Sequence, residues 1–264
     1  MNDLRTATIS NNFMFRLVME KPELCRQLLE RVLDVEITDI VYPDAEKSLE
    51  AQLTSKGIRL DIYVTLADGT VIDVEMQTAD SSRDSLAKRT RYYQSVLDND
   101  ALKKGELYTR LRKTAIIFIC TFDPFGKNFG RYTFSNRCHE DSELSLEDDV
   151  VKMFLNTRGD RHRISKDLSN LLDYINGNEP KDDFTRQLQD EVELQREDDG
   201  RRALYMTYSQ TLMEVEEKGI EKGVERGMLK ALFGLVKDGV ISEADAARRA
   251  GMSLENFTKA VLTL

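Results

Sequence analysis

The sequence contains few of the residues that build disulfide frameworks, zinc sites and histidine-based catalytic sites. Its 264 residues include three cysteines, two histidines, four prolines and no tryptophan. The cysteines, Cys25, Cys120 and Cys138, are scattered, without a pair at metal-ligand spacing, which argues against a disulfide framework and against a zinc site. His139 and His162 lie in charge-rich surroundings without a nearby Ser or Cys nucleophile signature, so a catalytic triad is not expected.

Long apolar segments are also missing. The longest apolar stretch covers residues 115–120, which is far too short to cross a bilayer, and no charged-then-apolar leader opens the sequence. We therefore expect a cytoplasmic protein with no membrane partner. A chain of 264 residues can bury a sizeable core and is long enough for one large domain with an appendage.

Negative charge is unevenly distributed along the chain. The formal net charge is −9, yet residues 1–138 hold 20 acids and 20 bases, whereas residues 139–199 hold 18 acids and 8 bases. Within the neutral half, residues 83–113 carry nine bases and four acids. This segment predicts a local basic surface, which is compatible with phosphate binding although the whole chain is acidic.

The stretch LDIYVTLADGTVIDVEMQ, residues 60–77, predicts two strands joined by a turn. Apolar and polar residues alternate on both sides of residues 67–69, which is typical of half-buried strands. A two-residue loop would place the apolar sets of the two strands on opposite faces, which is costly when one face is buried. A three-residue loop with Gly69 in the left-handed conformation avoids this cost. The pairs that it predicts are Leu66 with Thr70, Val64 with Ile72, Ile62 with Val74, and Tyr63 with Asp73.

The same register places two acidic side chains opposite each other. Asp61 faces Glu75 with the β-carbons about 5 Å apart, and Arg59 faces Gln77. Facing carboxylates repel, so the pair needs a physical reason. One reason is a divalent cation such as Mg²⁺, which prefers carboxylate and carbonyl oxygens and binds water and phosphate at its remaining positions. The alternative is an exposed hairpin whose acids face water.

Other segments predict a mixed α/β core. Apolar residues at helical spacing over residues 12–33, interrupted by Pro22, predict one kinked helix or two. A helix capped by Ser82 is expected to continue to about Leu111, with an apolar face toward the sheet. That face comprises Leu86, Tyr93, Val96 and Leu97. The continuous apolar run within residues 113–122 predicts a buried central strand. Further strands are expected near residues 37–42, 130–136 and 150–157.

The chain is expected to be mainly helical from Ser165 onward. Glycines recur every fourth residue at 219, 223 and 227, and each costs about 1 kcal/mol relative to alanine inside a helix. This repeat indicates either self-association through close helix packing or a solvated, charged linker. Beyond it, Ser242 and Ser253 are candidate helix caps and Gly251 can end the first of two short helices. Such a pair resembles a helix-turn-helix, which either touches DNA or is only a packing unit.

The order of these features resembles the PD-(D/E)XK nuclease superfamily, and more closely the recombination-promoting nuclease family, often labelled putative transposases. The resemblance spans almost the whole chain. The matching segments are NNFMFRLVM, ELCRQLLERVL, KGIRLDIYV, VIDVEMQ, RYYQSVL, KGELYTRL, AIIFICTFDPFG and the glycine-repeat tail.

This resemblance implies a restriction-endonuclease-like mixed sheet core flanked by helices, with a helical C-terminal tail. Asp61 and Glu75 would bind Mg²⁺ or another divalent cation, helped by the backbone carbonyl of Met76. Gln77 stands where the superfamily pattern places lysine, and glutamine supplies no positive charge. Lys56 or Arg59 could provide that charge from nearby. Asn12 stands where relatives often have an acid, and its carbonyl oxygen could still bind a metal.

The resemblance predicts a magnesium-dependent DNA endonuclease linked to recombination or mobile elements. Gln77 would orient water or phosphate in the catalytic step. DNA-backbone contacts are expected from Arg83, Lys88, Arg89 and Arg91. The alternative is a catalytically weak DNA-binding or oligomeric accessory protein on the same scaffold. The expected divisions are a nuclease-like core over residues 1–164, a helical extension over 165–208, and a tail over 209–264 through which the chain forms a homo-oligomer.

Overall fold

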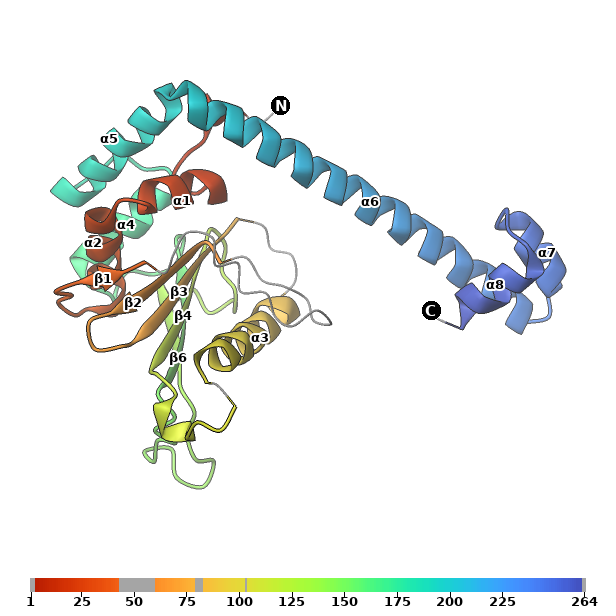
Figure 1. Ribbon diagram of the computed structural model, residues 1–264, viewed down its shortest axis with the longest axis horizontal. Helices are drawn as coiled ribbons and strands as arrows, with labels where there is room; N and C mark the ends of the chain where they lie inside the picture. Colours follow the sequence, from red (N-terminus) through yellow and green to blue (C-terminus); the bar gives the residue numbers. More distant parts are fainter. Residues whose placement is uncertain (1–2, 43–59, 79–82, 103, 263–264) are drawn as a thin grey trace. The chain divides into compact units, whose positions relative to one another are not determined.

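The computed structural model describes residues 3–42, 60–78, 83–102 and 104–262. These residues divide into two compact units, residues 1–202 and residues 203–264. The first unit contains a mixed sheet with helices on both of its faces, which confirms the expected α/β class (Figure 1). The three-part division with boundaries at residues 164 and 208 remains a prediction.

The sheet has six strands in the order β1-β2-β3-β4-β6-β5. Strands β3, β4 and β6 are parallel to one another, whereas β1 and β2 on one side and β5 on the other are antiparallel to their neighbours. The strands are β1 (Ile40–Val41), β2 (Ile62–Leu66), β3 (Val71–Gln77), β4 (Thr114–Cys120), β5 (Arg131–Phe134) and β6 (Val150–Asn156).

Helices cover the two faces unequally. On one face, α3 (Arg83–Ala101) packs its buried side chains against alternate residues of the central strands, among them Ile116 and Phe118. The predicted apolar face of this helix, Leu86, Tyr93, Val96 and Leu97, is confirmed as buried. Most of the other helices of this unit lie toward the opposite face (Figure 1). They are η1 (Leu4–Thr6), α1 (Asn12–Met19), α2 (Pro22–Leu33), α4 (Lys166–Ile175) and α5 (Asp183–Glu197).

The hairpin between β2 and β3 has the register that the sequence predicts. Ile62 pairs with Val74, Tyr63 with Asp73 and Val64 with Ile72. The backbone N–H of Leu66 donates to the carbonyl of Thr70 at 2.8 Å, and Gly69 has φ +87°. The three-residue turn with a left-handed glycine is therefore confirmed.

Burial of β3 differs from the half-buried strand that alternation predicts. Residues 71–76 are all buried, including Asp73 and Glu75 on the face that was expected to be polar and open. The reason is the position of β3 between β2 and β4 with α3 packed over that face. Local alternation reports which side chains share a face, but not what covers it.

One of two open alternatives is confirmed, and two expected element boundaries are corrected. Residues 12–33 form two helices, because Pro22 begins α2 at its first turn, where its missing N–H costs no hydrogen bond. Helix α3 ends at Ala101 rather than near Leu111, since the chain turns at Gly105 with φ +92° and then forms the 3₁₀ turn η2 (Tyr108–Arg110). The expected first strand is limited to β1. Ser82, the predicted N-terminal cap of α3, lies outside the described residues.

The second unit consists of helices. Helix α6 (Asp199–Lys237) starts within the first unit and ends against α7 (Glu243–Arg249) and α8 (Leu254–Val261), where Leu229, Leu232 and Phe257 share a small apolar cluster. Both predicted caps are confirmed, because the Ser242 and Ser253 side chains accept backbone N–H groups. Gly251 has φ +70° and closes α7, as expected.

The glycine column lies on α6 and has no partner within the described chain. A Cβ added at position 219, 223 or 227 would meet no heavy atom within 4 Å outside the local helix backbone. Close packing inside the chain therefore does not offset the helix-propensity cost of these glycines.

Candidate active site

The two acids of the hairpin lie side by side and are bound to each other's strands. The backbone N–H of Asp61 donates to Glu75 Oε1 at 3.0 Å. In return, the backbone N–H of Met76 donates to Asp61 Oδ2 at 3.0 Å. This reciprocal pair of hydrogen bonds holds both carboxylates at the end of β3, as the predicted register requires.

Burial and charge act together on Glu75. Its side chain is only 4% exposed. Burial, together with the neighbouring Asp61 charge, raises the pKa of Glu75 to about 8, while Arg89 acts in the opposite direction. The interpretation of an open hairpin whose acids face water is therefore wrong for Glu75. An anionic Glu75 needs additional positive charge nearby.

A third carboxyl group, Asp73, lies on the same face of β3 two residues before Glu75. It is fully buried, and neither carboxyl oxygen has a hydrogen-bond partner among the residues that the structure describes. Burial raises the pKa of Asp73 well above its ordinary value, and the charges of Glu75 and Asp61 act in the same direction. The predicted register pairs Asp73 with Tyr63, but the burial of Asp73 was not predicted, although its spacing of two residues from Glu75 places both on one face.

The positive charge beside these acids comes from α3. Arg89 Nη1 donates to Gln77 Oε1 at 2.7 Å, and Arg89 Nη2 donates to the Tyr93 hydroxyl at 2.9 Å and to Glu75 Oε2 at 3.3 Å. Its guanidinium also lies 5.4 Å from the ring centroid of Tyr93 and 5.2 Å from that of Phe118. From the sequence, Arg89 was expected only to contact the DNA backbone, and these three partners were not predicted.

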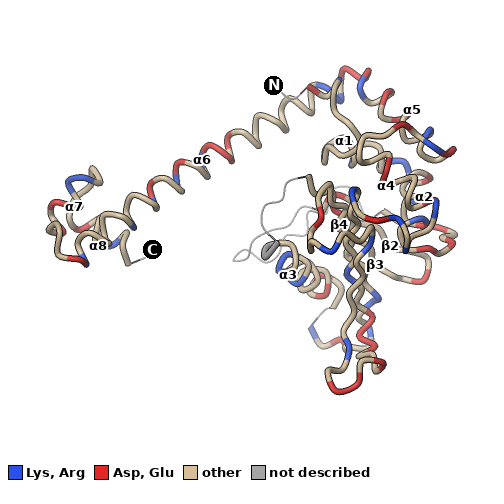
Figure 2. The backbone as a smooth tube through the Cα atoms, turned by 180° about the vertical axis from the view of Figure 1, so that it is seen from behind, with Lys and Arg blue, Asp and Glu red and all other residues tan. Residues whose placement is uncertain are grey.

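Some of the other predicted site residues are described by the structure, and some lie outside the described residues. Asn12 of α1 reaches the site. Its Nδ2 donates a hydrogen bond to the Met76 carbonyl at 3.1 Å, so the Asn12 amide holds a carbonyl that is itself a candidate metal ligand. Lys88 and Arg91 are exposed on α3, whose basic residues are marked blue in Figure 2. Lys56, Arg59 and the side chain of Arg83 lie outside the described residues.

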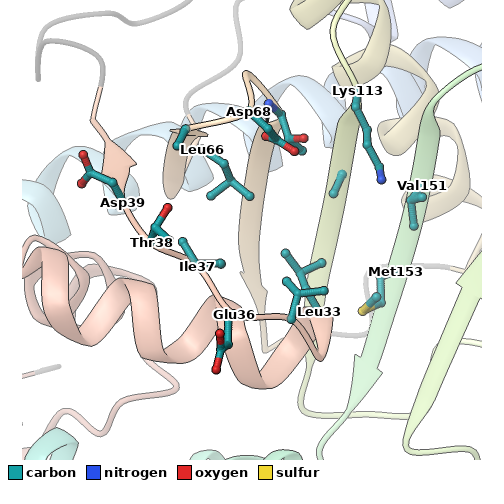
Figure 3. A pocket seen from close by; sticks show the side chains of 14 residues that line it. Leu33, Glu36, Ile37, Thr38, Asp39, Leu66, Asp68, Lys113, Val151 and Met153 are labelled. Atoms are coloured by element: carbon teal, nitrogen blue, oxygen red, sulfur yellow. Dashed lines mark hydrogen bonds between the residues drawn. The ribbon is translucent and has the colours of Figure 1, made fainter.

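A separate cavity of about 480 Å³ opens at the other end of the sheet (Figure 3). Its lining includes Leu33 and Ile37 next to Ala115, Val151 and Met153, which lie near the starts of β4 and β6. Because side chains alternate along a strand, these sheet residues face away from α3. The cavity therefore shares neither the face nor the strand end that carries Glu75.

Two further features of the described part of the chain concern metal-ligand clusters and membrane spans. No group of three or more His, Cys, Asp or Glu side chains there is arranged to hold a metal ion. None of the helices among these residues is long and apolar enough to cross a membrane.

A mixed sheet with a parallel centre, flanking helices and an acid-x-Gln element at the end of β3 defines a PD-(D/E)XK nuclease-like protein. The sequence matches the family described as "PD-(D/E)XK nuclease family transposase" over residues 10–198. The chain belongs to this family, which confirms the resemblance seen in the sequence and indicates a nuclease- or transposase-like activity. No match was found among curated proteins or among solved structures.

Proposed function

We propose that this protein is a magnesium-dependent DNA endonuclease that acts in recombination or on mobile elements. The observation that carries the proposal is the reciprocal arrangement of Asp61 and Glu75, in which two carboxylates are held together and one of them is buried. Family membership supports the nuclease chemistry and the link to transposase-like proteins.

The residues of this site fit a divalent cation. Asp61, Glu75 and the Met76 carbonyl offer only oxygen atoms, which hard cations prefer. Mg²⁺ commonly uses one or two protein carboxylates and leaves its other positions to water and phosphate, so two carboxylates are sufficient. The buried charge of Glu75 would be compensated by the cation. When bound, the cation would polarise the phosphodiester and assist activation of water.

The protein's own groups would then hold the substrate in place. Asn12 fixes the Met76 carbonyl through its amide, and Gln77 lies at the end of β3 beside the acids. The exposed bases Lys88 and Arg91, together with Arg83, would bind the DNA backbone without reading its sequence. Because phosphate contacts release counterions, DNA binding should weaken steeply as salt concentration rises.

The second candidate is a DNA-binding or oligomeric accessory protein with little catalytic activity. The observation that favours it is Gln77, which replaces the lysine of the superfamily pattern and carries no charge. The two candidates differ in one measurable outcome, namely whether the full chain cuts DNA when magnesium is present.

The test is a nicking assay on supercoiled plasmid with the full chain, in magnesium and in chelator. The variants are Asp61→Asn and Glu75→Gln, which keep side-chain shape while removing a ligand charge. Asp68→Asn, in the exposed turn of the same hairpin, is the matched control. We expect magnesium-dependent nicking by wild type and by the control, and loss of at least about 100-fold in the two site variants. Undiminished nicking by both site variants would remove the catalytic assignment, and no nicking by wild type would favour the accessory role.

A further inference from the structure

We propose that Arg89 is the positively charged catalytic group of this active site, replacing the lysine that the superfamily pattern has at the position of Gln77. Gln77 and Tyr93 are its positioning residues. This inference rests on the nuclease function proposed above, and it assigns a role to each of the three side chains that meet beside Glu75.

Arg89 is held as an active-site group rather than as a surface base. Its side chain is 32% exposed, so it is shielded on most sides yet still reachable by a substrate. Two of its terminal nitrogens have partners on β3 and one also binds Tyr93, four residues along the same helix. By contrast, Lys88 and Arg91 beside it are exposed.

The replacement of lysine by glutamine follows from this placement. A lysine at position 77 would bring its ammonium close to the guanidinium of Arg89, and two like charges at short range would repel. Glutamine instead offers a carbonyl oxygen, which accepts the 2.7 Å hydrogen bond from Arg89 Nη1. The positive charge beside the acids therefore comes from α3, which packs over β3, and not from β3 itself.

The longest of the three contacts indicates how Arg89 would act. The contact to Glu75 is 3.3 Å, compared with 2.7 Å to Gln77 and 2.9 Å to Tyr93. Once a cation compensates Glu75, the arginine no longer needs that carboxylate, while Gln77 and Tyr93 still fix its plane. A guanidinium has five N–H donors and suits the oxygens of a phosphate, so Arg89 would contact the scissile phosphate and stabilise its developing charge.

Two opposite effects are expected when this charge is removed. In Arg89→Gln the nicking rate should fall on the order of 100-fold, as for loss of one transition-state contact. Magnesium affinity measured without DNA should instead rise, on the order of tenfold, because a positive charge that competes for Glu75 is gone. A merely structural arginine would lower both quantities together.

The experiment uses the full chain and two readouts, calorimetric titration of the chelator-treated protein with magnesium alone and plasmid nicking at saturating magnesium. The variants are Arg89→Gln, Gln77→Lys, and the double variant Gln77→Lys/Arg89→Gln. Arg26→Gln is the matched control, since Arg26 is similarly part-buried and pairs with Glu23 and Glu30 on α2. We expect wild-type nicking in the control, tighter magnesium binding with weak nicking in Arg89→Gln, and at least tenfold recovery of nicking in the double variant.

Three results would overturn the role of Arg89: wild-type nicking by Arg89→Gln, weaker magnesium binding in that variant, or no recovery in the double variant. Melting in chelator identifies a variant that has failed to fold, and Arg89→Lys, which keeps the charge, must then retain more nicking than Arg89→Gln for the proposal to stand. Failure of the nuclease proposal is a different observation, because wild type itself would then neither bind magnesium nor nick DNA.

Discussion

At the scale of single residues, the site gathers carboxyl groups whose negative charge the described residues compensate only in part. Asp61 directly precedes β2, Asp73 and Glu75 lie on β3, and Arg89 contacts Glu75. Such an arrangement costs folding free energy in the absence of a ligand, because each buried carboxylate loses hydration. Binding a cation would recover part of this cost.

The raised pKa of Glu75 predicts how metal-free stability depends on pH. A carboxyl whose folded-state pKa is raised from 4.5 to about 8 binds more protons in the folded state than in the unfolded state between these values. The free energy of unfolding should therefore fall as pH rises through this window, by up to about 1.4 kcal/mol per pH unit. Glu75→Gln should flatten the slope between pH 5.5 and 8 and be more stable than wild type at pH 8, as measured by urea unfolding in chelator.

The control for this pH prediction is Glu23→Gln. The pKa of Glu23 is lowered, chiefly by its hydrogen bond with Arg26, so its contribution is complete above pH 4.5 and cannot change the slope in the measured window. An unchanged slope in Glu75→Gln would mean that this carboxyl is not perturbed in the folded protein.

Asp73 gives a second prediction at this scale. Its carboxyl group is fully buried and without a hydrogen-bond partner among the described residues, and its pKa is raised well above the usual range. Asp73→Asn removes the ionisable group at nearly constant shape, so it should raise the metal-free melting temperature at pH 8 relative to wild type. A melting temperature at pH 8 well below that of wild type would show that the carboxylate itself stabilises the fold.

At the scale of elements, the β2–β3 hairpin sets the position of the acids through its turn. A change of one residue in the loop would shift the register by one and move every side chain of a strand to the other face. Helix α3 then decides whether that face is open or buried. Each element alone leaves the site incomplete, since the strands supply the carboxylates and the helix supplies the arginine.

The turn itself is tested by Gly69→Val. Gly69 has φ +87°, and a Cβ there would meet nothing within 4 Å, so backbone conformation rather than space opposes a side chain. A β-branched residue resists positive φ, and we expect a loss of about 1–3 kcal/mol of stability together with reduced nicking. Gly69→Asn is the comparison, because asparagine tolerates the left-handed region and should lose less. Equal stability of Gly69→Val and wild type would contradict the three-residue turn.

At the scale of the whole molecule, the second unit has an unexplained surface. Helix α6 carries Ile220 and Val224 with exposed fractions of 60% and 67%, next to the glycine column. These two residues are four apart and therefore lie on one face of the helix. Self-association would cover this face and would also offset the cost of the glycines.

We therefore predict that the full chain is a homo-oligomer held together through α6. Light scattering should give an oligomer for the full chain and a monomer for a chain that ends near Tyr208. Ile220→Lys/Val224→Lys should also dissociate the oligomer, whereas Glu221→Lys on the same exposed segment adds a positive charge without removing apolar surface and should leave it intact. Monomers in the full chain and in the shortened chain alike would end the association hypothesis.

The sequence by itself determined the parts of this protein that depend on local chemistry. Alternation and the turn residues 67–69 specified the hairpin register, and with it the meeting of Asp61 and Glu75. The apolar run of β4, the proline that begins α2 and the serine caps of α7 and α8 identified elements in the same way. Each of these signals lies within a few residues of the feature that it predicts.

Only the tertiary structure decided what those elements enclose. Alternation could not show that β3 is buried on both faces, because burial depends on α3 and on two neighbouring strands. The spacing between Gln77 and Arg89 does not reveal that they share a 2.7 Å hydrogen bond, since the position of Arg89 depends on how α3 packs against Phe118 and its neighbours. The pKa of Glu75 and the place of the positive charge follow from that packing, because desolvation and short-range Coulomb forces act between groups brought together by the fold and not by the sequence.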